Sequence, residues 1–167
     1  MITRRGLIGT GAMFGGIAVL QGKIAMDALA KEAFPVTKSD TEWRAQLSPE
    51  QYNVLRKHGT ERAGTSPLNR EKRKGTFLCA GCDQDLFSSD TKFESGTGWP
   101  SFYQPLANAV ETTTDRSFFM TRTEAHCARC GGHLGHVFED GPKPTGLRYC
   151  MNGIAMKFKP DAAAQSS

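Results

Sequence analysis

The chain has 167 residues, of which 38% are hydrophobic, with five cysteines, 18 glycines and a formal net charge of +4 at pH 7. This length suits one domain with its own hydrophobic core, and the absence of an acidic or basic block argues against a nucleic-acid partner. Residues 1–30 hold three cations and one anion, so the charge of the remainder is only +2.

The first 30 residues resemble an export signal. Two arginines at positions 4 and 5 precede a mild, glycine-rich apolar run over residues 7–20. This run is shorter than the roughly 20 apolar residues that span a bilayer. A small-x-small cleavage site at residues 28–30 completes the pattern of a twin-arginine-type signal peptide. We therefore expect an exported, periplasmic protein with no stable membrane anchoring after signal removal; a frayed or merely anchoring N-terminus is the alternative.

Two short helices are predicted next. The stretch SDTEWRAQL favours a brief helix capped by Ser39 or Asp40. In SPEQYNVLRKHG, Ser48 is the expected cap, Gln51 completes a capping box and Gly59 ends the helix.

From residue 61 the pattern changes to loops and short strands. Residues 61–75 indicate a polar surface loop, and no later run is followed by a helix long enough for a parallel crossover, so antiparallel pairing is expected. The expected strands are TFLCA, LFSS, AVETT, SFFMTRT, HVFED, LRYCMN and IAMKFK. The sequence thus predicts a mainly β domain with an N-terminal helical cap and a disordered tail at 160–167.

Four of the five cysteines form two CxxC pairs. Cys79 and Cys82 make the first pair, Cys127 and Cys130 make the second, and 44 residues separate the pairs. Four thiolates from two tight turns are the ligand set of tetrahedral zinc, and such a site has no open position for a metal-bound water. We therefore predict one structural zinc ion per chain, which holds two distant hairpins together.

Three alternatives to this structural zinc site remain open from the cysteines themselves. An exported protein can form disulfides, and one CxxC pair can act in redox chemistry, although no thioredoxin-like βαβ pattern accompanies it. A nucleic-acid zinc ribbon would need aromatic and basic residues clustered at the pairs, which the sequence lacks, so no nucleic-acid partner is expected.

Cys150, the fifth cysteine, lies in the stretch GLRYCMNGIAMKF. Alternate residues of a strand share a face, so Arg148, Cys150 and Asn152 are expected to point one way, and Tyr149 and Met151 the other. A neighbouring cation stabilises a thiolate, and asparagine can hydrogen-bond to it or to a substrate. This pattern favours a reactive thiol, while a small buried side chain is the alternative.

Two histidines and a tryptophan are further candidates. His133 and His136 would face opposite ways on a regular strand, but Gly135 permits a bulge that brings both to one side. There they can act as acid–base groups beside Cys150, although ordinary core or surface histidines fit the same spacing. Trp99 lies on a glycine-flanked turn in SGTGWPSF, a position suited to a pocket wall.

Several motifs together resemble one enzyme family, the B-class peptide-methionine (R)-S-oxide reductases. In order they are CAGC, SGTGWPSF, CARCGGHLGHVFEDGP and PTGLRYCMN. The resemblance implies two antiparallel sheets with short N-terminal helices, a reductase domain at 47–159 after an N-terminal segment at 31–46, and a zinc site remote from the chemistry. It implies Cys150 as nucleophile. The supporting residues that it implies are His133, His136, Trp99 at the substrate methyl group, Arg148, Asn152 and Asp140.

The reaction that the resemblance implies is the reduction of methionine-R-sulfoxide in proteins, or of the free amino acid. The Cys150 thiolate attacks the sulfoxide sulfur, methionine leaves and Cys150 becomes a sulfenic acid. General acid catalysis typically contributes about 10²–10⁴ in rate. A cation beside the thiol raises its reactivity only about threefold, because nucleophilicity falls with thiol pKa. The histidines are therefore expected to matter more than Arg148.

Thr97 stands where many relatives carry a second, resolving cysteine. With four cysteines on zinc, none remains to form an internal disulfide with Cys150. We therefore expect an external reductant, either a thioredoxin-like protein or another thiol, and we expect a monomer whose other partners are oxidised proteins. A zinc-stabilised module that binds methionine or its sulfoxide without turnover is the alternative from a different functional class.

Overall fold

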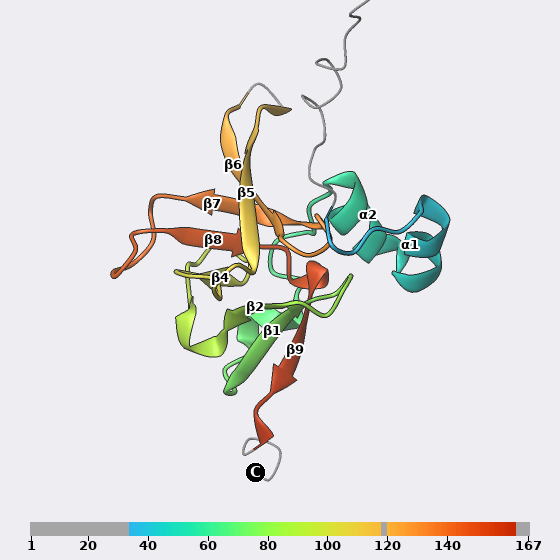
Figure 1. Cartoon of the computed structure of the whole chain (residues 1–167). Coiled ribbons are helices and arrows are strands. Elements are labelled where there is room, and N and C mark those ends of the chain that lie inside the picture. The colour runs from blue at the N-terminus through green and yellow to red at the C-terminus, as the bar shows by residue number, and fades with distance from the viewer. Residues whose placement is uncertain (1–33, 118–119, 163–167) are drawn as a thin grey trace, which may run out of the picture. The chain divides into compact units, whose positions relative to one another are not determined.

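A computed structural model describes residues 34–117 and 120–162 (Figure 1). The signal peptide expected at residues 1–30 lies outside these ranges, and the expected C-terminal tail is described only as far as residue 162. Within the described ranges, no helix has the length and apolar character needed to cross a membrane.

Two capped helices begin the described part of the chain. Helix α1 (Asp40–Gln46) starts after Ser39 and helix α2 (Pro49–Lys57) starts after Ser48, and each start is a complete capping box. These caps confirm the prediction. The left-handed residue that ends α2 is His58, with a φ of 55°, so Gly59 follows the turn instead of making it.

In the part of the chain that the structure describes, nine strands form two sheets, and every pairing there is antiparallel, as predicted. The strands are β1 (Gly75–Cys79), β2 (Asp85–Ser88), β3 (Lys92–Phe93), β4 (Ser101–Phe102), β5 (Val110–Asp115), β6 (Arg122–Cys127), β7 (His133–Phe138), β8 (Arg148–Met151) and β9 (Met156–Pro160). The smaller sheet has the order β2-β1-β9 and the larger sheet β3-β4-β8-β7-β6-β5 (Figure 1). The mainly β fold with two sheets and two short helices confirms the predicted fold class.

Aromatic side chains join the two sheets. The ring of Phe102 in β4 lies 4.9 Å from that of Phe77 and 4.3 Å from that of Phe87, both in the smaller sheet. All three are completely buried, and such pairs contribute about 0.5–1.5 kcal/mol beyond the burial of their area. Tyr149 of β8 packs against Phe87 from the same side. Its neighbour Cys150 therefore points to the opposite face of the larger sheet, as the alternation predicted.

The differences from the predicted strands have local causes. Strands β3 and β4 have two residues each, too few for an alternation pattern to appear in the sequence. Strand β6 begins at Arg122 instead of Ser117, and its polar sequence RTEAHC is held by main-chain pairing with a strand on each side. Strand β9 begins at Met156 because a 3-10 turn, η4 (Gly153–Ala155), precedes it.

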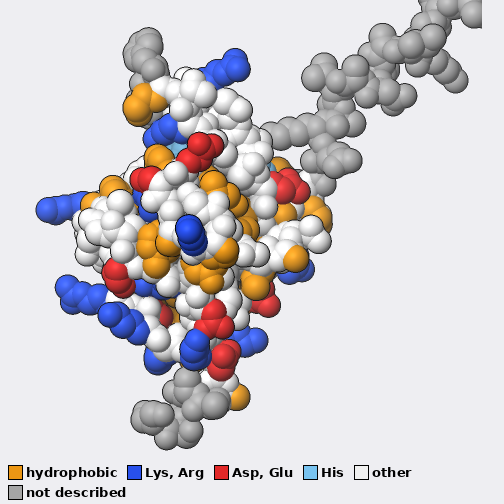
Figure 2. Space-filling view, turned by 90° about the vertical axis from the view of Figure 1, so that its left-hand side faces the viewer, with side chains coloured by type: hydrophobic (Ala, Val, Ile, Leu, Met, Phe, Trp, Pro, Cys, Tyr) orange, Lys and Arg blue, Asp and Glu red, His pale blue; other side chains and the backbone are white. Residues whose placement is uncertain are grey.

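Charges of both signs are spread over the surface. Figure 2 shows acidic and basic side chains interspersed on the face that it presents, with hydrophobic side chains gathered near the centre. Exposed ion pairs such as Lys157 with Asp83, at 2.9 Å, are typical of this surface. Pairs of this kind contribute only about 0–1 kcal/mol, so the buried contacts between the sheets dominate the stability.

Candidate active site and metal centre

The four paired cysteines come together at one place. Cys79 ends β1 and Cys127 ends β6, and the turn after each strand carries the second cysteine of its pair. The four Sγ atoms lie within 4.8 Å of one another, with Cys79 and Cys130 at 3.8 Å and Cys82 and Cys127 at 3.5 Å. A zinc ion with Zn–S bonds of about 2.3 Å separates its sulfurs by about 3.8 Å in an ideal tetrahedron. This donor set therefore fits a tetrahedral metal ion.

The surroundings of this cluster also suit a metal centre. The N–H of Gly81 donates to Cys79 Sγ at 3.4 Å, the main-chain contact expected from glycine in CAGC. The five cysteines are free thiols, so no disulfide joins them in the described structure. None of the four lines the cavity that contains Cys150. The cluster is thus separate from the candidate reactive thiol.

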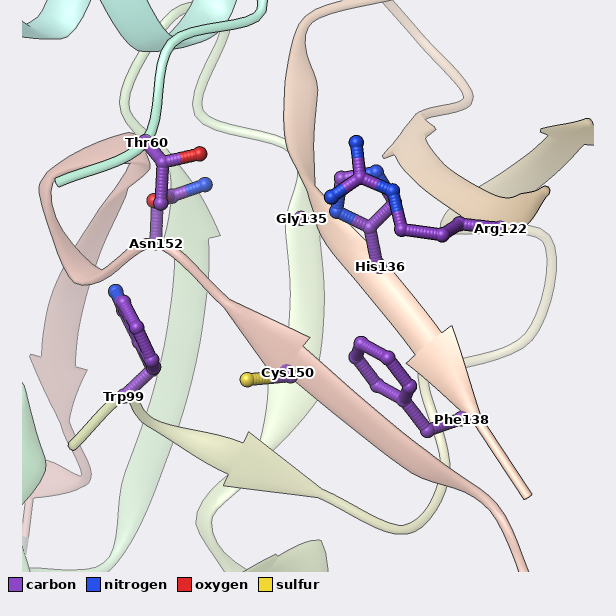
Figure 3. A pocket seen from close by; sticks show the side chains of 8 residues that line it. All are labelled: Thr60, Trp99, Arg122, Gly135, His136, Phe138, Cys150 and Asn152. Atoms are coloured by element: carbon purple, nitrogen blue, oxygen red, sulfur yellow. The ribbon is translucent and has the colours of Figure 1, made fainter. Parts of the chain in front are cut away.

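A cavity of about 140 Å³ opens beside Cys150 (Figure 3). This volume is below the roughly 300–1,000 Å³ of pockets for drug-sized ligands, and it suits a single inserted side chain. Figure 3 shows the Cys150 sulfur pointing toward Trp99, while the side chains of His136 and Arg122 lie by the neighbouring strand β7. The lining residues are Thr60, Trp99, Arg122, Gly135, His136, Phe138, Cys150 and Asn152.

The pairing of β7 with β8 places His136 beside Cys150. The two residues are cross-strand partners, and such partners project their side chains on the same face of a sheet. The residue before His136 is Gly135, where a Cβ atom would lie 2.1 Å from the Cys150 carbonyl oxygen. Only glycine fits this close approach of the two strands.

A bulge in β7 brings the two histidines to one side. Ala125 of β6 pairs with Gly135, whereas the next residue, His126, pairs with His133, so β7 holds one extra residue. The rings of His133 and His136 are consequently 5.3 Å apart. The bulge expected from the glycine is therefore present.

Asp115 anchors His136 from behind. Its Oδ2 lies 2.9 Å from His136 Nε2 and 2.7 Å from Arg122 Nη2. Burial lowers the pKa of His136. The hydrogen bond with Asp115 raises it, and the charge of Arg122 lowers it, so the pKa is lowered on balance. Hydrogen bonds from Ser117 and, more weakly, His136 hold the pKa of Asp115 well below its usual value. The charged carboxylate can only accept, so the hydrogen of the neutral imidazole is on Nε2 and Nδ1 is the free nitrogen.

His133 lies behind His136 and lines an adjoining cavity, which shares Thr60, Arg122 and His136 with the cavity beside Cys150. Its part in the site stays a prediction. The side chain is only 2% exposed, and its Nδ1 lies 2.7 Å from Glu124 Oε1. The same oxygen lies 3.0 Å from His58 Nδ1. Burial raises the pKa of Glu124, but the bond and charge of His133 and the charge of His58 outweigh it and hold that pKa at about 2. His133 thus belongs to a hydrogen-bonded layer behind the cavity wall.

Arg148 and Asp140 form an ion pair next to the cavity but do not line it. Arg148 Nε and Nη2 donate to the two carboxylate oxygens at 2.8 and 2.9 Å, a geometry typical of strong bidentate pairs. The guanidinium group lies 4.3 Å from the ring centre of Phe138. The bond to Asp140 raises the pKa of Arg148, and the nearby Cys150 sulfur acts in the same direction. Arg148 is thus a fixed cation close to the thiol.

Asn152 and Trp99 both line the cavity, and the side chain of Asn152 is already engaged. Its Nδ2 donates to the Leu134 carbonyl at 3.1 Å, and its Oδ1 accepts from the Glu61 N–H at 2.9 Å. The expected bond to a thiolate or substrate is therefore replaced by bonds to the main chain. The Trp99 Nε1 donates to the Glu61 carbonyl at 3.2 Å.

Known proteins match most of the chain. The family described as the SelR domain matches residues 47–160. The chain belongs to the MsrB family of peptide methionine sulfoxide reductases. It is 57% identical over 127 residues to the peptide methionine sulfoxide reductase MsrB of Leptospira interrogans, covering 75% of this chain and 97% of that protein. It is 58% identical over 126 residues to the MsrB of Agrobacterium fabrum, covering 75% and 93% of the two chains.

Thr97 provides a hydroxyl group beside the thiol in this member of the MsrB family. Its Oγ1 lies 3.8 Å from Cys150 Sγ and 2.8 Å from Ser95 Oγ, which in turn lies 2.7 Å from the buried Ser101 Oγ. The Ser101 hydroxyl is 3.2 Å from the Trp99 carbonyl. A row of hydroxyl groups therefore connects the Cys150 sulfur to the main chain of the cavity wall.

The sequence analysis missed six residues of the site. Glu61 begins the segment interpreted as a polar surface loop and Thr60 precedes it, and nothing in the composition there marks an inward-facing carboxylate. Arg122, Glu124 and Asp115 lie in strands whose polar alternation indicates a solvated sheet equally well. The missed residues are Thr60, Glu61, Asp115, Arg122, Glu124 and Phe138.

Proposed function

We propose that this chain reduces the R epimer of methionine sulfoxide in proteins to methionine, with Cys150 as the nucleophile. The supporting observation is the position of Cys150 in a side-chain-sized cavity, with Trp99 in front of its sulfur and His136 directly across the sheet. Membership of the MsrB family supports the substrate class. Selectivity for the R epimer rests on the family motifs and is tested below.

The proposed reaction transfers oxygen from one sulfur to another. With the substrate methyl group against Trp99, the Cys150 thiolate attacks the sulfoxide sulfur, a bond forms between the two sulfurs, and the sulfoxide oxygen takes up one proton. The resulting hydroxyl group then passes to the Cys150 sulfur. The bond between the two sulfurs and the bond between the oxygen and the methionine sulfur break, a bond between the oxygen and the Cys150 sulfur forms, methionine leaves, and Cys150 is left as a sulfenic acid. The methionine sulfur gains two electrons and the cysteine sulfur loses two.

His136 is the proposed proton donor. Its Nε2 is held by Asp115, so Nδ1 is the nitrogen that carries the transferred proton. The lowered pKa of His136 leaves few rings protonated at neutral pH, but each protonated ring is a stronger acid toward the sulfoxide oxygen. Asp115 fixes the ring orientation throughout, while Arg148, held by Asp140, is a permanent cation near the thiolate.

An external thiol is proposed to clear the sulfenic acid. A thiol attacks Cys150, water leaves and a mixed disulfide forms; a second thiol then releases Cys150 and carries away the new disulfide. The hydroxyl group of Thr97, and no second thiol, is next to Cys150. The other four thiols belong to the metal cluster.

We propose that this cluster holds one structural zinc ion. Cys79, Cys82, Cys127 and Cys130 supply four thiolates, which suit zinc and leave no position for catalysis at the metal. Bound there, the ion would join the ends of β1 and β6. We also propose export through the signal at residues 1–30, a route that carries already folded proteins, and a monomeric state.

The test of this function uses the zinc-loaded protein with resolved R and S methionine sulfoxide and an excess of dithiol. Methionine is quantified beside a Cys150→Ser control. We expect repeated turnover of the R epimer alone, abolished in the control. Turnover of the S epimer, or equal turnover in Cys150→Ser, would contradict the proposal. Binding of the sulfoxide without methionine formation would instead support a binding module.

A further inference from the structure

Glu61 bonds to two residues that line the cavity, although its own side chain does not line it. Its N–H donates to Asn152 Oδ1 at 2.9 Å, at the end of β8. Its carbonyl accepts from Trp99 Nε1 at 3.2 Å. One residue of the loop after α2 therefore connects the strand that carries Cys150 to the indole in front of its sulfur.

The carboxylate of Glu61 caps the turn that follows Cys150. Asn152 is the N-cap residue of η4, but it makes no side-chain capping bond, since its amide is used on Leu134 and on Glu61 itself. The two Glu61 carboxylate oxygens instead accept from the N–H groups of Gly153 and Ile154. Both are among the first N–H groups of the turn, which find no partner within it.

A cap supplied by a distant residue has a consequence that a local cap would lack. A serine or aspartate at the N-cap position would satisfy the turn alone, without burying a carboxylate from another segment. Burial raises the pKa of Glu61, against the two main-chain N–H groups, and a half-buried charge is expensive unless it is hydrogen-bonded. The long-range bond therefore does more than finish a turn, because it also fixes the loop that holds Trp99.

We propose that Glu61 is a positioning residue that sets the separation of Trp99 from Cys150 and thereby the width of the substrate cavity. The proposal depends on the proposed function only in taking this cavity as the place of the sulfoxide group. Cys150 is fixed by strands on both sides, with Ser101 and His136 as its partners. Among the described residues, the hydrogen-bond partner of the indole nitrogen is the Glu61 carbonyl, so release of Glu61 lets the indole move while Cys150 stays in place.

The variant Glu61→Gln tests this role with little change of shape. The oxygen of the glutamine amide can accept a hydrogen bond from one of the two main-chain N–H groups. Its NH₂ group then faces the other N–H and cannot accept from it. We expect KM for methionine sulfoxide to rise about tenfold and kcat to change by less than about threefold, because binding is lost and the reacting groups are intact. Alkylation of Cys150 by iodoacetamide should keep its wild-type rate.

Fluorescence gives a second readout that needs no turnover. The chain has two tryptophans, so Trp43→Phe makes Trp99 the only indole. Dimethyl sulfoxide serves as the probe in this background. We expect its concentration for half-maximal quenching to rise about tenfold in Glu61→Gln, in parallel with KM. If the wild-type protein binds the probe but forms no methionine from methionine sulfoxide, the proposed function is contradicted. The comparison of quenching between wild type and Glu61→Gln still tests the role of Glu61 in that case.

A double-mutant cycle with Trp99→Phe separates positioning from general stabilisation. Phenylalanine lacks the indole N–H, so Glu61→Gln should change KM by less than about twofold in that background. Glu111→Gln, which removes a carboxylate 62% exposed on β5, should leave KM unchanged. A tenfold effect that persists in Trp99→Phe, or a fall in melting temperature with unchanged KM, would overturn the proposal. Should Glu61→Gln fail to fold, Glu61→Asp is measured in the same cycle with the same criteria.

Discussion

His136 and Cys150 lie directly opposite each other on β7 and β8. Side chains at such positions have Cβ atoms about 4.5–5.5 Å apart, so the pairing of two strands is enough to bring the proposed proton donor to the proposed nucleophile. The approach of the strands depends on Gly135, and the orientation of the imidazole depends on Asp115. The two side chains are therefore placed by the sheet, and the loops supply part of the cavity around them.

Proton donation should outweigh thiolate stabilisation in the rate. His136→Ala removes the proposed donor, and we expect the single-turnover release of methionine to slow by about 10²–10⁴. Arg148→Ala removes a cation beside the thiol and should slow it only about threefold, because a less stabilised thiolate is also more nucleophilic. Rapid quenching and quantification of methionine compare the two variants. Equal or reversed losses would refute this ranking.

A cysteine at position 97 should convert the protein to internal disulfide chemistry. The Thr97 hydroxyl is 3.8 Å from Cys150 Sγ, so the Thr97→Cys thiol can attack the sulfenic acid. One turnover without reductant should then remove two free thiols and yield a 97–150 disulfide in a peptide map. Ser95→Cys is the matched control, since Ser95 contacts Thr97 and Ser101 but makes no bond to Cys150. If Ser95→Cys formed a disulfide with Cys150 to the same extent, the specific proximity of position 97 to Cys150 would be contradicted.

Metal content should follow the four paired cysteines and not the fifth. Wild-type protein and Cys150→Ser are expected to carry one zinc ion per chain, and Cys127→Ser to lose it. Structural zinc contributes on the order of 10 kcal/mol to folding, so chelation should unfold the domain. Elemental analysis and circular dichroism measure the two effects. A full zinc complement in Cys127→Ser would exclude the four-cysteine site.

Glu124 should make stability depend on pH in the acidic range. Its pKa is about 2 in the fold and 4.5 ordinarily. A carboxyl whose pKa is lowered contributes stability above pH 4.5 and loses it as the pH falls from 4.5 toward 2. Glu124→Gln should thus be less stable than wild type at pH 7, by a difference that shrinks at pH 3.5. Urea unfolding of both proteins at pH 7 and pH 3.5 tests this prediction. Loss of metal in acid affects wild type and Glu124→Gln alike, so it cancels in the difference between them. A constant difference would contradict the prediction.

Features determined by local chemistry could be predicted from the sequence. The caps at Ser39 and Ser48 depend only on residues three positions away. The four-cysteine cluster follows from the spacing of its pairs. The outward direction of Cys150 and the inward direction of Tyr149 follow from the alternation of one strand. Each of these needs no knowledge of where other segments lie.

Features determined by tertiary register could not be predicted in this way. The bulge brings both histidines to one side, but only the cross-strand register shows that His136 reaches the cavity and His133 does not. The bonds of Glu61 join residues more than 90 positions apart. The four-residue pairing of β3 with β4 is likewise too short to appear as a pattern. Such relationships exist only after the sheets have formed.

Strand β8 lies inside the larger sheet, bonded to β4 on one edge and to β7 on the other. In the proposed cycle the Cys150 sulfur carries in turn a hydrogen, an oxygen and another thiol, and each is larger than the one before. Because both edges of β8 are paired, we expect its backbone at Cys150 to stay in place as the group bound to the sulfur becomes larger. The volume for the larger group is then expected to come from movement of the loops that carry Thr97 and Thr60. We therefore expect the strand that carries Cys150 to stay fixed while the neighbouring loops adjust, so that the same sulfur can contact first a substrate and then a reductant of different shape.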